Sequence, residues 1–144
     1  MSVEESKAIV RRFAEEILNE KMLARADEII AQDYVDHGAM PGQAPGLEGF
    51  KSKGSMWFAA VPHLHVRTDD MFAQGDRVAV RWTAEGTQSG ALLGIPASGR
   101  FFRFTGMSIF RVADGKIAEQ WEEWDKLDLM HQLGAIPAAA HGAR

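Results

Sequence analysis

A change in the spacing of apolar residues at Pro62 limits the folds open to this chain more than any other feature. Before Pro62, apolar residues recur every three or four positions or at multiples of that spacing, which is typical of amphipathic helices. After Pro62 they alternate with polar residues, which is typical of half-buried strands. Because the helices come first and the strands follow, the pattern predicts an α+β fold.

Three helices are predicted ahead of Pro62. Ser2 and Glu5 form an S-x-x-E capping box, which predicts the start of the first helix. Its apolar stripe consists of Ile9, Val10, Phe13, Ile17 and Leu18. A shorter helix places Leu23, Ala26, Ile29 and Ile30 on one side, and a third contains Leu47, Phe50, Trp57 and Val61. The stretch YVDHGAMPGQAPG, residues 34–46, holds three glycines and two prolines and is predicted to be a loop.

About four antiparallel strands are predicted after Pro62. Two alternating stretches, 64–70 and 78–85, flank a turn at Asp76, and a long aromatic-rich strand candidate covers 100–112. The turn Ala113-Asp114-Gly115-Lys116 leads into a strand over 117–124, and a final helical turn over 127–133 ends at Gly134. An antiparallel sheet curled against the helices would enclose a space for a ligand.

The composition indicates one ordinary globular domain, 1–144, with 135–144 as a flexible or partner-packed tail. The 16 basic residues do not cluster and are outnumbered by 20 acidic ones, which argues against a nucleic-acid-binding protein. The absence of cysteine excludes disulfides, thiol nucleophiles and thiolate metal sites. No apolar run approaches the roughly 20 residues that span a bilayer. The N-terminus also lacks the pattern of a signal peptide, so we expect a cytoplasmic protein.

Several stretches resemble the SnoaL-like polyketide cyclase (ester cyclase) family of the nuclear-transport-factor-2-like superfamily. They are YVDHGAMPGQAPGLEGFK, the hairpin AQGDRVAVRWTAEGTQSG, the loop GIPASG and above all DGKIAEQWEEWDKLDLMHQLG. The resemblance implies a curved antiparallel sheet wrapped around N-terminal helices, forming a cone-shaped barrel with an internal cavity. It also implies a homodimer packed through the open face of the sheet. The implied activity is an intramolecular aldol-type ring closure of a small hydrophobic, carbonyl-containing polyketide ester, without cofactor or metal.

Asp125 is the residue that matches the general acid/base of the family. A carboxylate can remove a proton next to a carbonyl if apolar neighbours desolvate it and raise its pKa, and Trp121 and Trp124 could supply such surroundings. The alternative is that Asp125 only caps the short helix that follows it. Strand alternation places Gln120, Glu122 and Trp124 on one face. It places Glu119, Trp121, Glu123 and Asp125 on the other, where Glu119 is a minor candidate.

Three further residues are candidates for binding or polarising the substrate carbonyl. Tyr34 and His37 lie in the YVDH turn, where the family often has a tyrosine and a histidine, and either could donate a hydrogen bond. The alternative is that both only stabilise the loop. The characterised cyclases place a histidine on the penultimate strand, but 100–112 contains none, and Arg103 is the substitute that the sequence offers.

The remaining candidates are expected to line the cavity: Trp57, His65, Met107, Trp121 and Trp124. His63 and His65 form an H-x-H pair, but the sequence offers no convincing third or fourth ligand for a metal. Two alternatives to a cyclase stay open. One is a non-catalytic protein that binds a small apolar ligand, and the other is an isomerase or epoxide hydrolase of the same superfamily.

Overall fold

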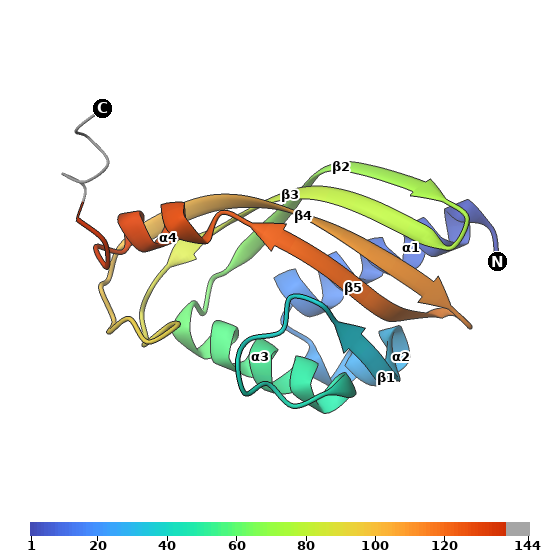
Figure 1. Cartoon of the computed structure of the whole chain (residues 1–144), viewed down its shortest axis with the longest axis horizontal. Coiled ribbons are helices and arrows are strands. Elements are labelled where there is room, and N and C mark those ends of the chain that lie inside the picture. The colour runs from blue at the N-terminus through green and yellow to red at the C-terminus, as the bar shows by residue number, and fades with distance from the viewer. Residues whose placement is uncertain (138–144) are drawn as a thin grey trace.

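The computed structural model describes residues 1–137 and consists of N-terminal helices against a curved sheet (Figure 1). The expected tail, 135–144, lies outside the described residues from 138 onward. The helical elements are α1 (Val3–Arg12), η1 (Phe13–Asn19), η2 (Leu23–Arg25), α2 (Ala26–Ile29), α3 (Gly46–Ala60) and α4 (Lys126–Gln132). The capping box is confirmed: the Ser2 side chain accepts from the Glu5 amide, and the Glu5 carboxylate accepts from the Ser2 amide.

The sheet has five strands in the order β1-β5-β4-β3-β2. They are β1 (Ile30–Asp36), β2 (His65–Gln74), β3 (Arg77–Thr87), β4 (Phe101–Ala113) and β5 (Lys116–Trp124). The four strands after Pro62 pair antiparallel, which confirms the predicted α+β arrangement and the hairpin turns. The sheet curves over the helices but does not close on itself, since β1 and β2 remain as edges.

The prediction missed β1, because it assigned Ile29 and Ile30 to a helix and 34–46 to a loop. α2 ends at Ile29, and the chain then runs as an edge strand parallel to β5. The pairing is irregular between Ile30 and Val35, and the burial of β1 does not alternate cleanly. Without a regular period of two, a short edge strand cannot be distinguished from a helix end by its sequence.

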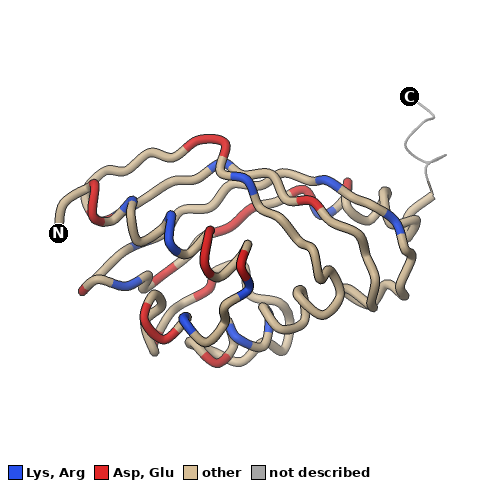
Figure 2. The backbone as a smooth tube through the Cα atoms, turned by 180° about the vertical axis from the view of Figure 1, so that it is seen from behind, with Lys and Arg blue, Asp and Glu red and all other residues tan. Residues whose placement is uncertain are grey.

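The core forms two clusters of buried side chains along the concave side of the sheet. One joins α1, η1 and α3 to one end of the sheet through residues such as Phe13, Phe50 and Phe110. The other gathers around Phe102 and Phe104 and includes residues of α4. Trp82 packs against both clusters. Figure 2 shows that acidic and basic residues intermix along the backbone, whereas much of the half of the molecule that carries the C-terminus has no charged residues.

Candidate functional site

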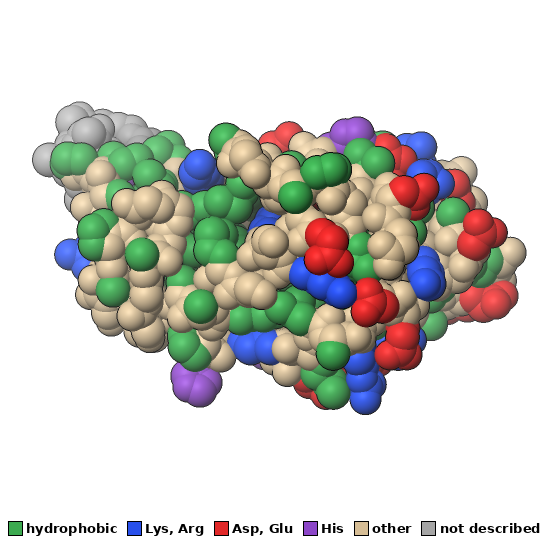
Figure 3. Space-filling model, turned by 90° about the horizontal axis from the view of Figure 1, so that it is seen from below, with side chains coloured by type: hydrophobic (Ala, Val, Ile, Leu, Met, Phe, Trp, Pro, Cys, Tyr) green, Lys and Arg blue, Asp and Glu red, His purple; other side chains and the backbone are tan. Residues whose placement is uncertain are grey.

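A cavity of about 160 Å³ lies between the helices and the concave face of the sheet. Its walls come from α1, η1 and α3, from the inner faces of all strands except β1, and from the loops at 38–40 and Leu93. Seen from the side of α3, hydrophobic side chains line a hollow, and the charged side chains of this face gather toward the other end of the molecule (Figure 3). The predicted space for a ligand between the sheet and the helices is therefore present, as a pocket that opens to the surface.

Aromatic side chains make up much of the wall. Trp57 of α3 and Trp124 of β5 lie 6.1 Å apart between ring centroids, and Phe104 of β4 lies 5.0 Å from Trp124. Trp82 meets the same phenylalanine edge-on at 5.8 Å. Tilted and edge-to-face rings of this kind form a rigid apolar wall that suits a flat hydrophobic ligand. The predicted placement of Trp57 and Trp124 in the cavity wall agrees with this geometry.

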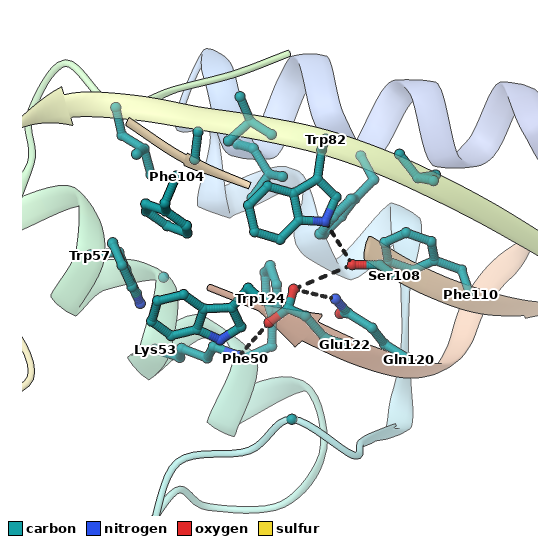
Figure 4. Close-up of a pocket in the computed structure, with 18 of the residues that line it drawn as sticks. Phe50, Lys53, Trp57, Trp82, Phe104, Ser108, Phe110, Gln120, Glu122 and Trp124 are labelled. Carbon is teal, nitrogen blue, oxygen red and sulfur yellow. Dashed lines mark hydrogen bonds and ion pairs between the residues drawn. The ribbon is translucent and has the colours of Figure 1, made fainter. Parts of the chain in front are cut away.

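Glu122 supplies the carboxyl group of the cavity. It lies on the inner face of β5 between Gln120 and Trp124, and 17 % of its side chain is exposed. Its Oε2 accepts a hydrogen bond from Gln120 Nε2 at 2.9 Å and one from Ser108 Oγ at 3.4 Å (Figure 4). Its Oε1 lies 3.9 Å from Lys53 Nζ. One oxygen of Glu122 is thus held by neutral donors, and the other points to the only cation among the residues that line the cavity.

Tyr34 fixes the orientation of Gln120. Its hydroxyl is buried and donates to Gln120 Oε1 at 2.6 Å, which leaves the Gln120 amide nitrogen to donate to Glu122. Burial raises the pKa of Tyr34 far above its ordinary value, so the hydroxyl keeps its proton. Tyr34 is a member of the site network, but it supports the cavity wall from behind and does not line the cavity itself.

Trp82 and Ser108 hold Glu122 from the other side. The indole N–H of Trp82 donates to Ser108 Oγ at 3.0 Å, and this hydroxyl in turn donates to Glu122. Gly106 makes this arrangement possible, because a Cβ at that position would lie 2.3 Å from the Trp82 ring. Ser108 pairs with Glu122 in the β4–β5 register, so adjacent strands bring the two side chains together.

Lys53 of α3 is held in place by Asp36 at the end of β1. Lys53 Nζ lies 3.2 Å from Asp36 Oδ2, and the Asp36 side chain is only 5 % exposed. Asp36 also accepts from the Gly38 amide at 2.8 Å and from Gln43 Nε2 at 3.2 Å. The carboxylate of Asp36 is therefore satisfied on both oxygens and anchors the ammonium group at the edge of the cavity.

Burial raises the pKa of Glu122 above the ordinary value of a glutamate. Lys53 and the hydrogen bonds from Ser108 and Gln120 oppose this shift, and the charge of Asp36 adds to it. The desolvation is the largest cause because the aromatic walls replace most of the water around the carboxyl group. A carboxyl group with a raised pKa is a better proton acceptor once it is ionised.

The expectation that two tryptophans desolvate Asp125 is wrong. β5 ends at Trp124, and Asp125 is exposed, with its Oδ1 accepting the Asp128 amide at 3.0 Å as the N-cap of α4. Its own amide donates to Thr105 O, which ends the strand pairing and turns the side chain away from the cavity. The capping alternative describes the structural role of Asp125.

His37 and Trp121 lie together, but outside the cavity. Trp121 is on the outer face of β5 and stacks on His37, with the two ring centroids 4.9 Å apart. The guanidinium carbon of Arg77 lies 4.7 Å from the centroid of the indole. His37 Nε2 lies 2.6 Å from Glu119 Oε2, and Arg111 Nε donates to the other oxygen of Glu119. Neither residue reaches the cavity, because alternation along β5 sends Trp121 to the face opposite Glu122.

Arg103, Met107 and His65 are also outside the cavity. Arg103 and Met107 occupy alternate outward positions of β4, where Arg103 pairs with Glu85 at 3.3 Å and Met107 is 62 % exposed. His65 lies beside His63 in a separate surface pocket near Phe101. The inward positions of β4 carry Phe102, Phe104, Gly106, Ser108 and Phe110 instead.

Sequence reasoning missed Glu122, Lys53, Ser108, Gln120 and Trp82 as site residues. One signal was present, because alternation placed Gln120, Glu122 and Trp124 on one face. The prediction did not use it, since it expected Trp121 and Asp125 of the opposite face at the cavity together with Trp124. Lys53 had no such signal, because only the packing of α3 against β1 brings it to Asp36.

Residues 1–137 contain neither a metal-binding cluster nor a helix that could span a membrane. No group of three or more histidine, aspartate or glutamate side chains in this part of the chain is arranged to hold a metal ion. None of its helices is long and apolar enough to cross a membrane.

The fold and the cavity define a class of protein, in which helices and a curved, open sheet of an α+β domain enclose an apolar pocket with one internal carboxyl group. A family model described as SnoaL-like polyketide cyclase matches residues 8–133, so the chain belongs to this family. The structure of TsrD from Streptomyces laurentii is similar, with a TM-score of 0.87 and 32 % identity over 94 % of this chain and 99 % of that one.

Two relatives carry names that state an activity. The chain is 28 % identical over 129 residues to the aklanonic acid methyl ester cyclase DnrD of Streptomyces peucetius, covering 88 % of each protein. It is also 28 % identical to the aklanonic acid methyl ester cyclase DauD of Streptomyces sp. (strain C5), covering 88 % of this chain and 80 % of that protein. The family resemblance predicted from the sequence is confirmed.

Proposed function

We propose that this protein is a cofactor-independent cyclase that removes a proton next to a carbonyl of a hydrophobic, polyketide-like ester and closes a ring by an intramolecular aldol-type reaction. The observation that carries the proposal is the position of Glu122, a carboxyl group with a raised pKa on the wall of an apolar cavity. Family membership and the two relatives named as ester cyclases support the reaction type.

Glu122 is the proposed base and later the proposed acid. Oε2 is occupied by Gln120 and Ser108, so Oε1 takes the proton from the carbon between two carbonyl groups. The resulting enolate carbon forms a bond to a second carbonyl carbon of the same molecule, and the new alkoxide oxygen receives the proton from Glu122. The reaction consumes no net protons and transfers no electrons, so it can proceed without a cofactor.

The rigid network around Glu122 supports this role. Gln120 and Ser108 are each fixed by a second hydrogen bond, from Tyr34 and Trp82 respectively. Positioning a base within a fraction of an ångström is a large part of catalysis, and side chains locked by packing achieve it best. The flat aromatic walls would orient a polyketide ring against Oε1.

The test compares Glu122→Gln with Asp125→Asn on a panel of esters. The panel contains the methyl ester of aklanonic acid and simpler 1,3-dicarbonyl esters, and ring closure is followed by mass spectrometry and absorbance. We expect Glu122→Gln to lower kcat by roughly 100-fold or more, the contribution of a positioned base. Unchanged turnover by Glu122→Gln, or a loss confined to Asp125→Asn, would remove Glu122 as the base.

The second candidate function is a non-catalytic protein that binds a small apolar ligand. The exposure of Asp125 favours this candidate, since the matching family residue is not in the cavity. Binding of panel esters by wild type without conversion would establish it. The other enzymes of the superfamily are disfavoured. An epoxide hydrolase would need Arg103 to face the cavity, but Arg103 faces outward and pairs with Glu85. An isomerase would need a tyrosine hydroxyl free to bind the substrate, but the Tyr34 hydroxyl donates to Gln120.

We further propose a homodimer that packs through the outer face of the sheet. Met107 and Ile109 are exposed at neighbouring outward positions of β4, and Phe101 is exposed on the same face beyond Arg103 and Thr105. Exposed apolar side chains that gather on one face are typical of a contact surface. Light scattering should give a dimer for wild type and a monomer for Met107→Glu. A monomeric wild type would contradict the proposal.

A further inference from the structure

Lys53 is the one cation at the cavity wall, and the mechanism above leaves it without a role. Its ammonium has three donors. Asp36 accepts one at 3.2 Å, and the 3.9 Å separation from Glu122 Oε1 is too long for a hydrogen bond. Lys53 therefore keeps donors for a ligand directly beside the oxygen that acts as base.

The spacing of the two groups fits the two ends of an enolising unit. A carbonyl oxygen and the neighbouring carbon lie about 2.4 Å apart, given bond lengths of roughly 1.2 and 1.5 Å. Glu122 Oε1 and Lys53 Nζ lie only 3.9 Å apart. The oxygen of such a unit can therefore lie about 2.8 Å from Nζ while its carbon lies about 3.2 Å from Oε1. One planar fragment can thus contact both residues at the same time.

The charges of the cluster also fit this reaction. Asp36, Lys53 and ionised Glu122 carry a net charge of −1 together, and proton transfer moves one negative charge from Glu122 to the enolate oxygen, so the cluster and the substrate together stay at −1. The charge thereby goes from a position 3.9 Å from the ammonium to a direct hydrogen bond with it. A fixed donor that interacts more strongly with the product of proton transfer than with the reactant lowers the barrier.

We propose that Lys53, positioned by Asp36, binds the carbonyl oxygen of the substrate and holds it as the enolate, so that the site selects compounds that can place a carbonyl oxygen on Lys53 and the neighbouring carbon on Glu122 at the same time. The inference rests on the proposed function, because Glu122 supplies the negative charge.

The test uses 4-nitrophenol, a single-ring enol mimic whose ionised form is yellow, so that absorbance reports the bound form. It is done in the Glu122→Gln background, where the neutral amide mimics the protonated base. The comparison variants are Glu122→Gln/Lys53→Met and the matched control Glu122→Gln/Lys51→Met. Lys51 is on the same helix but pairs with Asp27 away from the cavity. The neutral ligand 4-nitroanisole, which has no ionisable oxygen, reports whether the cavity itself is intact.

We expect Glu122→Gln to bind the phenolate in preference to the phenol. Lys53→Met should weaken phenolate binding by roughly 10- to 100-fold, the contribution of a charge-assisted hydrogen bond, while the affinity for 4-nitroanisole and the Lys51→Met control stay unchanged. Asp36→Asn should lower the ratio of phenolate to phenol affinity by a smaller factor, because Lys53 is kept but loses its anchor. Equal phenolate affinity with and without Lys53, or no phenolate binding by Glu122→Gln, would overturn the inference.

This outcome is independent of the proposed function. Phenolate binding is measured without turnover. Ring closure that continues in Glu122→Gln would therefore reject only the assignment of Glu122 as the base. Loss of ring closure in Glu122→Gln together with unaltered phenolate binding in Lys53→Met would reject the role of Lys53 alone.

Discussion

The two faces of β5 carry the same kinds of residue in opposite environments. The inner face presents Gln120, Glu122 and Trp124 to the cavity, and the outer face presents Glu119 and Trp121 to the open side of the sheet. Each face therefore combines a glutamate with a tryptophan at a spacing of two residues. The sequence alone does not distinguish them.

The surroundings separate the two glutamates. Hydrogen bonds from His37 and Arg111 lower the pKa of Glu119, so it is an ionised member of a surface network. Burial raises the pKa of Glu122, where the compensating cation is at 3.9 Å and the remaining contacts are neutral. The comparison indicates that a carboxyl group becomes a candidate base when the partners around it are neutral donors and aromatic walls, and not through its residue type.

The largest expected difference between the faces concerns the tryptophans. Trp124→Ala removes a ring that packs against Phe104 and Trp57, and we expect it to cost about 3 kcal/mol of unfolding free energy. Trp121→Ala removes only the His37 stack and the Arg77 contact, at a cost of about 1 kcal/mol. Urea denaturation of both variants measures the difference, and equal costs would break the distinction between the faces.

A smaller effect is expected from adding one carbon to the inner surface at Gly106. A Cβ there meets the Trp82 ring, so Gly106→Ala should cost about 2 kcal/mol by overpacking and displace the indole from Ser108. The matched control is Gly106→Ala combined with Trp82→Leu, in which the clash is absent and the added cost should largely disappear. If the cost of Gly106→Ala is the same in both backgrounds, the close approach of Trp82 is not its cause.

At the end of β5, Asp125→Ala should cost about 1 kcal/mol through loss of the α4 cap. Ring closure of any ester that wild type converts should be unchanged, since the Asp125 side chain does not line the cavity. Asp125→Asn is the conservative control, because asparagine caps a helix about as well as aspartate. A drop in kcat that asparagine does not restore would indicate a chemical role for this carboxylate.

The smallest effects concern the dependence of stability on pH, which the two glutamates should change in opposite directions. Because the folded protein raises the pKa of Glu122, it binds that proton more tightly than the unfolded chain, and stability falls as pH rises from the ordinary glutamate value through the raised one. Glu119 has a lowered pKa, so its contribution is present above the ordinary value and is lost as pH falls through the lowered one. Thermal unfolding between pH 4 and 8 should therefore give a higher Tm for Glu122→Gln and a lower Tm for Glu119→Gln at the alkaline end. The same sign for both variants would contradict the assigned environments.

Much of the fold could be predicted because its signals are local and periodic. The capping box at Ser2, the helical stripe of α3 and the alternation along β3 all appear in the structure where the sequence placed them. β1 could not be predicted, because its pairing with β5 joins residues far apart in the chain and its burial does not alternate. The missed strand also hid part of the site, since Asp36 ends β1 and anchors Lys53.

The sequence by itself determined the α+β class and the family, because periodicity and motif spacing are properties of neighbouring residues. It also predicted an aromatic cavity wall, but the structure places Trp57 and Trp124 in that wall and Trp121 outside it. Only the tertiary structure decided which carboxyl group faces that cavity. Strand β5 ends one residue before Asp125, and the cap of α4 turns that side chain to solvent, while Glu122 remains inside. Desolvation depends on what surrounds a group in space, and for Glu122 those surroundings come from β3, β4 and α3.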